Sequence, residues 1–457
     1  MNGRQSLGRW LAGFCLAAAL LSGWTATAVG QTVGMVVNHD AREVYIFDAD
    51  TDTLLQTLPI PLPPGELGGL YDCVVTAAGR GFVSDYNGRR VWPINLTNPG
   101  APILEAHIDV PIEVQDLDLS VDQQRLLAAG AGTPRPLIVL DAATGALVGQ
   151  AAGGYQGVEA CSNNTILATQ YSPPSPYYPG AVMELTLRGD NSLPVQSGPQ
   201  PLLTAINAAC EPFAEAGVGV TNEVQEVYVL GLPGIVPGSY QGLASPGIAA
   251  VFSPRRNALF VRSENFVQRF PYDAVGQTLG AADMTYSLYS TKPCFGVDPL
   301  AIHPNGSKLY VPEDSVGLQV WDAIAGSYLG HIDMSDTTMQ RPARMAGVCL
   351  PEMLRMTIDI EASVINPAEP GTVGVVIYGT VEHPASHIVS SSLSFGGNAG
   401  PIGKVNKGDY NGDGAADMRV YFARTAFGLQ PGDRTACLTG YLKSGVTFAG
   451  CDALTMP

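Results

Sequence analysis

The chain has 457 residues and a formal net charge of −17, and only 14% of its residues are charged. A typical soluble domain has about 25% charged residues, whereas this chain is rich in turn-forming residues, with 53 Gly and 35 Pro. Such a composition is typical of many short buried strands joined by turns. The acidic balance argues against a nucleic-acid partner and against binding to anionic membrane surfaces, because like charges repel.

The first residues have the pattern of a secretory signal peptide. Arg4 and Arg9 supply a positive region, Leu11 to Leu21 an apolar region, and Ala26-Thr27-Ala28 a small-residue cleavage site. We therefore expect residues 1–28 to be removed and the mature chain to be exported, either periplasmic or extracellular. A membrane anchor is the alternative, but the apolar run is shorter than the roughly 20 residues that a spanning helix needs. No later stretch is long and apolar enough to span a bilayer.

A pattern of short apolar strands separated by polar turns recurs along residues 32–352. The most regular strand of each copy starts, at intervals of 40 to 52 residues, near Gly34, Gly81, Leu126, Ile166, Val218, Leu259 and Leu309. Repeats of this period predict a seven-bladed β-propeller, because a single small antiparallel sheet cannot bury both of its faces. No strand precedes the first copy, but one follows the last copy, from Arg344. We expect this strand to complete the first blade and close the ring.

The Asp residues that end a strand in several copies are predicted to close turns. Asp48, Asp141 and Asp322 precede Ala and usually Thr or Gly, and an Asp in this position accepts hydrogen bonds from backbone N–H groups two residues on. We predict a similar turn-stabilising role for His303, which lies just before a Pro-Asn-Gly turn.

Two copies carry long Pro/Gly-rich loops, SPPSPYYP after Tyr171 and PGIVPGSYQGLAS after Leu232. Loop insertions on one rim are where propellers carry binding surfaces. Tyr171, Tyr177, Tyr178 and Tyr240 could form an aromatic platform there. The alternative is that these rings pack over the loop backbone.

The segment GVTNEVQEVYVL, with Val220-Thr221-Asn222, and the copy LYVPEDSVGLQVWDAIAGSYLG resemble the YVTN family of β-propeller repeats in bacterial and archaeal surface and periplasmic proteins. The resemblance covers roughly Gly34 to Glu352. It implies a propeller but leaves the function open, because the family includes binding and adhesive proteins as well as lactonase-like enzymes.

Seven cysteines lie beyond the leader: Cys73, Cys161, Cys210, Cys294, Cys349, Cys437 and Cys451. In an exported protein they predict disulfides with one thiol left over. Cys437 and Cys451 stand opposite each other on equal arms of a hairpin, within disulfide reach. The next pair is Cys161 with Cys210. Cys349 would pair with Cys294 or with Cys73, which would lock the ring shut.

Residues 356–457 follow a different all-β pattern, which predicts a smaller β-sandwich-like domain. Its segment DYNGDGAAD places oxygen side chains at alternate positions, as a hard cation requires. We therefore predict a calcium site formed by Asp409, Asn411, Asp413, the carbonyl of Ala415, and Asp417 directly or through a water. The bidentate Glu of an EF-hand is missing, since Val420 stands at position twelve. A metal-free turn is the alternative.

Ile358-Asp359-Ile360, this loop and the segment from Gly432 to Asp452 together resemble a C-terminal module that recurs in exported bacterial proteins. That module has an IDIKPGS-like start, a DVNGDGxxD loop and a hairpin ending in GCD. Glu361-Ala362 replaces its usual Lys-Pro. The resemblance implies a calcium-stabilised β-sandwich and brings no catalytic activity with it.

The sequence contains no nucleophile elbow, H-E-x-x-H, P-loop or Rossmann fingerprint, so we predict no catalytic or cofactor-binding residue. Our first hypothesis is an exported, non-enzymatic binding or scaffold protein whose propeller face and loops bind a protein or glycan partner. The alternative is a metal-dependent hydrolase or lactonase with its site in the propeller channel. Carboxylates that could line that channel are Asp72, Asp116, Glu159 and Asp298.

Overall fold

The structure analysed is a computed structural model. It describes residues 31–62, 68–131, 135–161, 165–171, 179–197, 207–210, 216–220, 225–232, 236–254, 257–289, 299–313, 317–334, 345–362, 364–366, 368–380, 383–396, 400–426, 429, 434–444 and 446–456. The predicted signal peptide lies outside these ranges. Within them the regular structure is β-strand apart from three short 3-10 turns, η1 (Ala385–His387), η2 (Ser390–Ser392) and η3 (Arg424–Ala426). The prediction of an all-β protein is confirmed.

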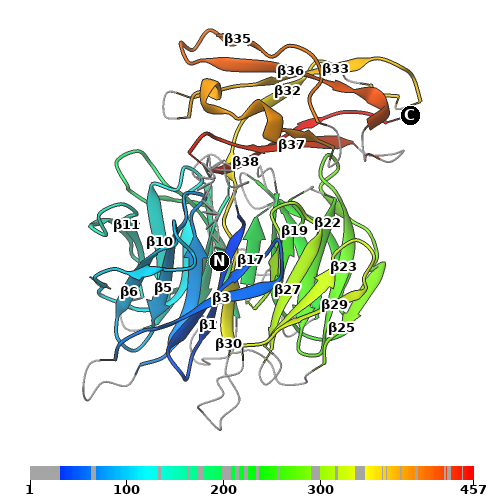
Figure 1. Ribbon diagram of the computed structural model, residues 1–457. Helices are drawn as coiled ribbons and strands as arrows, with labels where there is room; N and C mark the ends of the chain where they lie inside the picture. The colour runs from blue at the N-terminus through cyan, green and yellow to red at the C-terminus, as the bar shows by residue number, and fades with distance from the viewer. Residues whose placement is uncertain are drawn as a thin grey trace, which may run out of the picture.

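In the described part of the chain, the strands from β1 to β30 form seven antiparallel sheets, which stand around a common axis (Figure 1). The first sheet consists of β30 (Met345–Cys349), β1 (Val33–Asn38), β2 (Glu43–Asp48) and β3 (Thr53–Pro59). The second consists of β4 (Leu70–Val75), β5 (Arg80–Asp85), β6 (Arg90–Asn95), β7 (Ile103–Leu104) and β8 (Ile108–Asp109). The third consists of β9 (Glu113–Leu119), β10 (Arg125–Ala131), β11 (Leu137–Asp141) and β12 (Leu147–Ala151).

The remaining four sheets follow in chain order. The fourth consists of β13 (Tyr155–Ala160), β14 (Thr165–Tyr171), β15 (Pro179–Thr186) and β16 (Val195–Ser197). The fifth consists of β17 (Asn207–Cys210), β18 (Ala216–Val220), β19 (Glu226–Gly231) and β20 (Val236–Gly242). The sixth consists of β21 (Gly247–Phe252), β22 (Ala258–Ser263), β23 (Phe266–Asp273), β24 (Thr278–Leu279) and β25 (Met284–Ser287). The seventh consists of β26 (Ala301–Ile302), β27 (Lys308–Glu313), β28 (Gly317–Asp322) and β29 (Tyr328–Ile332).

All of the predicted repeat starts fall in the second strand of their sheet. These second strands are buried on both faces because each lies between two neighbouring sheets. In β1, for example, Met35 and Val37 pack into one apolar cluster, whereas Val36, whose side chain points to the opposite face, packs into another. A strand of this kind reads as a continuous apolar run in the sequence.

The ring closes as predicted. The late strand β30 pairs antiparallel with β1, with Val36 opposite Val348, so the first blade combines the two ends of the propeller segment. A disulfide between Cys73 and Cys349, whose Cα atoms are 5.9 Å apart, joins β30 to β4 of the next blade. The closing strand is thus held by hydrogen bonds on one side and by a covalent bond to the neighbouring sheet.

The other two predicted disulfides are also confirmed. Cys161 pairs with Cys210, and Cys437 lies opposite Cys451 in a hairpin and is bonded to it. Cys349 uses Cys73, one of its two expected partners. The other, Cys294, lies outside the described residues.

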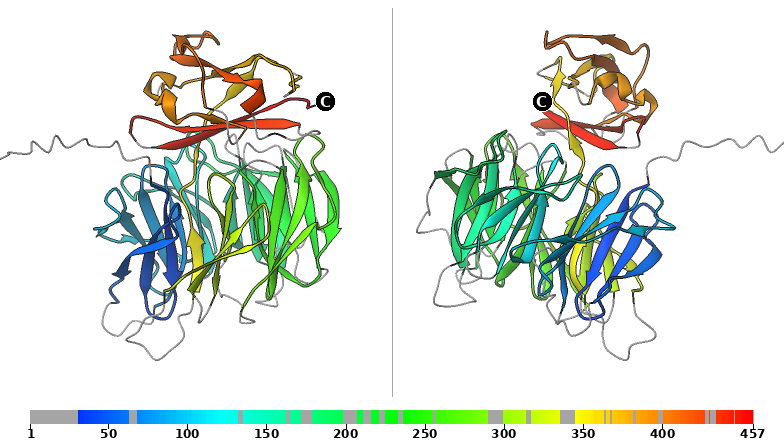
Figure 2. Two further views of the ribbon diagram at one scale, coloured as in Figure 1. Left: turned by 45° about the vertical axis from the view of Figure 1, so that its right-hand side comes forward. Right: turned by 90° about the vertical axis from the view of Figure 1, so that its left-hand side faces the viewer.

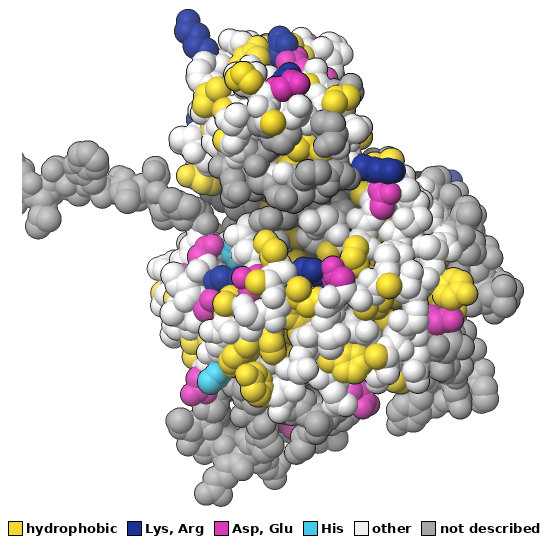
Figure 3. Space-filling model, turned by 90° about the vertical axis from the view of Figure 1, so that its right-hand side faces the viewer, with side chains coloured by type: hydrophobic (Ala, Val, Ile, Leu, Met, Phe, Trp, Pro, Cys, Tyr) yellow, Lys and Arg dark blue, Asp and Glu magenta, His cyan; other side chains and the backbone are white. Residues whose placement is uncertain are grey.

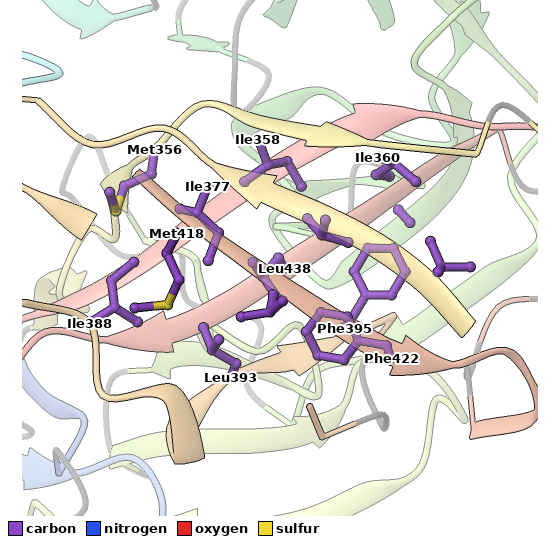
Figure 4. Close-up of a cluster of buried hydrophobic side chains, with 14 of the residues drawn as sticks. Met356, Ile358, Ile360, Ile377, Ile388, Leu393, Phe395, Met418, Phe422 and Leu438 are labelled. Atoms are coloured by element: carbon purple, nitrogen blue, oxygen red, sulfur yellow. The ribbon is translucent and has the colours of Figure 1, made fainter. Parts of the chain in front are cut away.

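The module after the propeller is a β-sandwich, as predicted. One sheet consists of β31 (Leu354–Arg355), β38 (Thr447–Ala453), β37 (Thr435–Tyr441) and β34 (Ser394–Phe395). The other consists of β32 (Ile358–Ile360), β33 (Thr372–Ile377), β36 (Asp417–Ala423) and β35 (Asn406–Gly408). An apolar core fills the space between them, and Figure 4 shows Ile377, Leu438 and the stacked rings of Phe395 and Phe422 within it.

The module lies over one end of the ring, with β37 and β38 nearest the propeller (Figures 1 and 2). An exposed ion pair of 3.3 Å between Arg434 Nη1 and Asp273 Oδ2 links the two parts. In each propeller sheet the first strand, such as β4 or β9, runs toward the module and ends near it. The second strand runs antiparallel to the first and therefore ends on the side away from the module. No helix in the described ranges is long and apolar enough to cross a membrane.

Candidate functional site

The turn residues predicted from the repeats have structural roles. Asp48 Oδ1 accepts the N–H of Asp50 at 2.8 Å, and Asp141 and Asp322 accept the equivalent bonds at 3.2 and 2.8 Å. His303 Nδ1 accepts the N–H of Asn305 at 3.2 Å. These interactions confirm the turn-closing roles that the sequence predicts.

Three of the four predicted channel carboxylates join neighbouring blades. Asp72 Oδ2 accepts the N–H of Leu117 at 2.7 Å, Asp116 Oδ2 that of Val158 at 2.6 Å, and Glu159 Oε1 that of Cys210 at 3.1 Å. In each case a carboxylate on the first strand of one blade binds the backbone of the first strand of the next. The structure therefore gives these carboxylates a role in holding the ring together. Asp298 lies outside the described residues.

A cavity of about 250 Å³, which we call the junction cavity, lies at the junction where the channel meets the module. Its walls are apolar side chains from the first strands of the blades, and the linker between β30 and β31 covers it. Four charged or titratable side chains line it: Asp118, Glu159, Glu352 and Arg355. Burial and the neighbouring Asp118 raise the pKa of Glu352 well above its ordinary value, and burial raises the pKa of Asp118 as well.

Glu159 is one of the channel carboxylates predicted from the sequence, whereas Asp118 and Glu352 were not predicted. One signal could have found Asp118: it stands two residues after Asp116 in β9, so both side chains point to the same face of the strand. Nothing in the sequence places Glu352 in the same cavity, because its position depends on how the linker leaves the closed ring.

The predicted calcium loop coils around its own oxygen atoms. Asp409 accepts the N–H groups of Gly412 at 2.7 Å and Gly414 at 3.0 Å. Asn411 Nδ2 donates to Asp413 Oδ2 at 2.8 Å, which brings these two side chains together. Gly412 and Gly414 have φ values of 78° and 86°, a region that favours glycine. The sharp turn thus needs glycine at both positions.

Asp417 anchors this loop to the sandwich. It is fully buried, and its two carboxylate oxygens accept the N–H groups of Gly379 at 2.9 Å and Tyr410 at 2.6 Å. The side-chain oxygens of Asp409, Asn411 and Asp413 remain exposed at the surface. Oxygen donors of this kind fit a hard cation such as calcium, together with the Ala415 carbonyl.

Within the described residues, no three His, Cys, Asp or Glu side chains form a metal-holding group. The predicted calcium ligands include an amide oxygen and a backbone carbonyl beside the carboxylates. A second cavity, of about 410 Å³, lies next to the loop and is lined by Arg355, Tyr378, His383, Asn411 and Asp413. The loop therefore faces β31, the strand that follows the linker.

The predicted tyrosine platform is only partly described. Tyr177 and Tyr178 lie outside the described residues, as does the side chain of Tyr171. Tyr240 in β20 is 60% exposed, and its ring centre lies 6.0 Å from that of Tyr228.

Two other aromatic groups were not predicted. Tyr289, which follows β25 in the sixth sheet, is 64% exposed and stacks against Trp321 of β28 in the seventh sheet. On the side of the molecule shown in Figure 3, hydrophobic side chains lie in small groups among acidic and basic ones.

The second group lies at the end of the propeller away from the module. The ring of Tyr71, at the start of β4, lies 5.9 Å from His39 and 5.4 Å from Tyr86. All three side chains are partly exposed. His39 Nδ1 lies 2.9 Å from the Leu70 carbonyl oxygen, which fixes the imidazole across the first two blades. We call His39, Tyr71 and Tyr86 the aromatic row.

Sheets around an axis and a β-sandwich over one end define a β-propeller protein with an accessory module. No protein-family model and no curated protein sequence matches the chain. A solved structure of a functionally unknown protein from Desulfotomaculum acetoxidans DSM 771 is similar, with a TM-score of 0.59, 18% identity, and coverage of 70% of this chain and 99% of that one. Apo AztD from Citrobacter koseri is also similar, with a TM-score of 0.51, 12% identity, and coverage of 70% and 98%. At these identities the likeness extends to the fold alone.

Proposed function

We propose that this is an exported, non-enzymatic binding or scaffold protein that binds a protein or glycan partner at the end of the propeller away from the module. The observation that carries the proposal is the aromatic row, whose three rings lie side by side at that end. Partly exposed tyrosine rings supply large contact area at low conformational cost, which suits both sugar rings and peptide side chains.

The surroundings of the row support a binding surface. Residues Asn38–Arg42 and Asp85–Arg89 form the turns on either side of it, and a buried ion pair between Arg42 and Asp85 fixes these turns relative to each other. A rigid, pre-organised surface loses little freedom when a partner binds. The channel carboxylates, by contrast, are engaged in bonds between blades, and the module covers the other end.

Export and the family resemblances are part of the same proposal. Three disulfides, with members in the first, second, fourth and fifth blades and in the module, suit an oxidising compartment. The YVTN-like segments and the DxNxDGxxD loop add support, since both resemble parts of exported proteins. We further propose that calcium, bound by the loop from Asp409 to Asp417, stabilises the module.

The row is tested by binding to a glycan array and a peptide array. We expect selective binding by the wild-type chain and a loss of affinity of about 10- to 30-fold in Tyr86→Ala, since truncating a tyrosine that anchors an interface often costs about 2 kcal/mol. Tyr289→Ala removes an equally large ring that is exposed after β25, away from the aromatic row, and should bind like wild type. Equal losses in the two variants, or no binding to either array, would overturn the proposal.

The calcium proposal is tested by elemental mass spectrometry of the gently purified chain. We expect one calcium per chain, and its loss in Asp413→Ala. Calcium at 100 times its dissociation constant should raise the free energy of unfolding of the wild-type module by about 2.7 kcal/mol, and that of the variant by much less. Asp190→Ala, which removes an exposed Asp that closes a propeller turn, should retain the metal. A wild-type chain without calcium would contradict the proposal.

A further inference from the structure

The junction cavity is large enough for a small organic molecule. Its volume is about 250 Å³, whereas an engineered protein cavity of about 150 Å³ binds benzene. Its apolar wall includes Val75, Ala209, Phe252 and Ile302, which are at most 8% exposed and belong to the first strands of four different blades. The cavity is partly open, so a ligand can enter it. Small-molecule sites are mostly apolar, with a few polar groups that orient the ligand.

The charged groups of the cavity come from both parts of the chain. Asp118 of β9 and Glu159 of β13 belong to the propeller, Glu352 belongs to the linker, and Arg355 belongs to β31 of the module. The three acidic side chains do not form a group that could hold one metal ion. Acidic groups and a basic group from separate elements thus line one cavity, and a ligand of several atoms can contact more than one of them.

Two of the acidic groups are held in place by the backbone. Asp118 Oδ1 accepts the N–H of Leu119 at 2.8 Å, and its Oδ2 accepts that of Ala160. Glu159 Oε1 accepts the N–H of Cys210 at 3.1 Å. A carboxylate has about four acceptor positions, so each of these groups can accept a further bond from a ligand. An ammonium group suits them, because it carries a positive charge and three donors.

Arg355 is not matched in the same way. Its Nη1 atom is buried and has no hydrogen-bond partner in the described part of the chain, although acidic side chains line the same cavity. A buried N–H group without an acceptor is costly. A guanidinium group fits a carboxylate particularly well, because the two can form a pair of parallel hydrogen bonds. A ligand carboxylate would therefore give Arg355 a hydrogen-bonded partner.

We propose that the junction cavity binds a small zwitterion, namely an α-amino acid with an apolar side chain. Its ammonium group bonds to the acidic side chains of the cavity, and its carboxylate bonds to Arg355. Its apolar side chain packs against the wall that includes Phe252 and Ile302. The site goes beyond the proposed binding function, because it lies at the end next to the module and takes a small molecule instead of a protein or glycan.

Calorimetric titration of the full chain with three ligands of similar size tests the site. Leucine carries both charges, leucinamide lacks the carboxylate, and 4-methylpentanoate lacks the ammonium group. We expect leucine to bind about 10- to 100-fold more tightly than either of the others, because hydrogen bonds to charged groups typically change affinity by such a factor. No binding of leucine, or equal binding of leucine and either of the other two ligands, would overturn the proposal.

Two variants assign the charges of the ligand to their partners. Arg355→Met should weaken leucine binding to the level of leucinamide and leave leucinamide unchanged. Glu352→Gln should weaken the binding of leucine and leucinamide but not that of 4-methylpentanoate. Arg419→Met and Glu361→Gln, which each break a surface ion pair on the module, should bind all three ligands like wild type. A loss of leucinamide affinity in Arg355→Met as large as the loss of leucine affinity would overturn the assignment of the carboxylate.

Discussion

Replacing Cys73 and Cys349 together by Ala should lower the free energy of unfolding of the propeller by about 4–5 kcal/mol. The two residues are 276 positions apart, and a cross-link that closes so long a loop removes much of the conformational freedom of the unfolded chain. The bond also holds the closing strand β30 against β4. Without it, the ring keeps only the hydrogen bonds and packing of that strand.

The experiment is denaturant unfolding of wild type and the double variant under oxidising conditions. A matched control is the pair Cys437→Ala and Cys451→Ala, which opens a loop with a separation of only 14 residues. Its loss should be about 3 kcal/mol and confined to the module. A smaller loss for the ring-closing bond than for the hairpin bond would contradict this interpretation.

Asp85→Ala should destabilise the propeller by about 3–5 kcal/mol, because it leaves the Arg42 guanidinium buried without its counter-ion. The pair is bidentate, with Arg42 Nη2 to Asp85 Oδ2 at 2.7 Å and Nη1 to Oδ1 at 3.1 Å. The exposed fractions of the two side chains are 7% and 0%. The charge of an ion buried to this degree is stabilised mainly by its partner, whereas the charge of an exposed ion is stabilised by water.

The same measurement on three variants separates the pair from its surroundings. Arg42→Met combined with Asp85→Leu removes both charges and should cost less than Asp85→Ala alone. Glu361→Ala breaks an exposed pair with Arg419 on the module and should cost far less than Asp85→Ala, because water stabilises exposed ions. A cost for Asp85→Ala as small as that of Glu361→Ala would show that the buried pair is not important for stability.

The sequence predicts the propeller well because its second strands are buried on both faces. Strands such as β1 and β22 are buried along their whole length, and this appears in the sequence as regular apolar runs. The outer strand β3 is largely exposed, so its residues carry little pattern. The two-residue strands β7 and β8 are too short for any periodicity.

Sites made by ring closure could be predicted only in part. The positions of Asp72, Asp116 and Glu159 near the axis follow from the repeat, but their partners are backbone N–H groups of the next blade. The placement of Glu352 and Asp118 in one cavity depends on the path of the linker. Local spacing, by contrast, is enough to predict the loop from Asp409 to Asp417, since all of its side chains belong to one turn.

The claim that the open end of the propeller is the binding surface is tested most directly by hydrogen-exchange mapping with the best ligand from the arrays. We expect protection on binding in residues 38–42, 70–72 and 85–89, with little change in the module or at the junction. Protection confined to the junction cavity, the calcium loop or the outer strands near Tyr289 would contradict the claim and move the binding surface there.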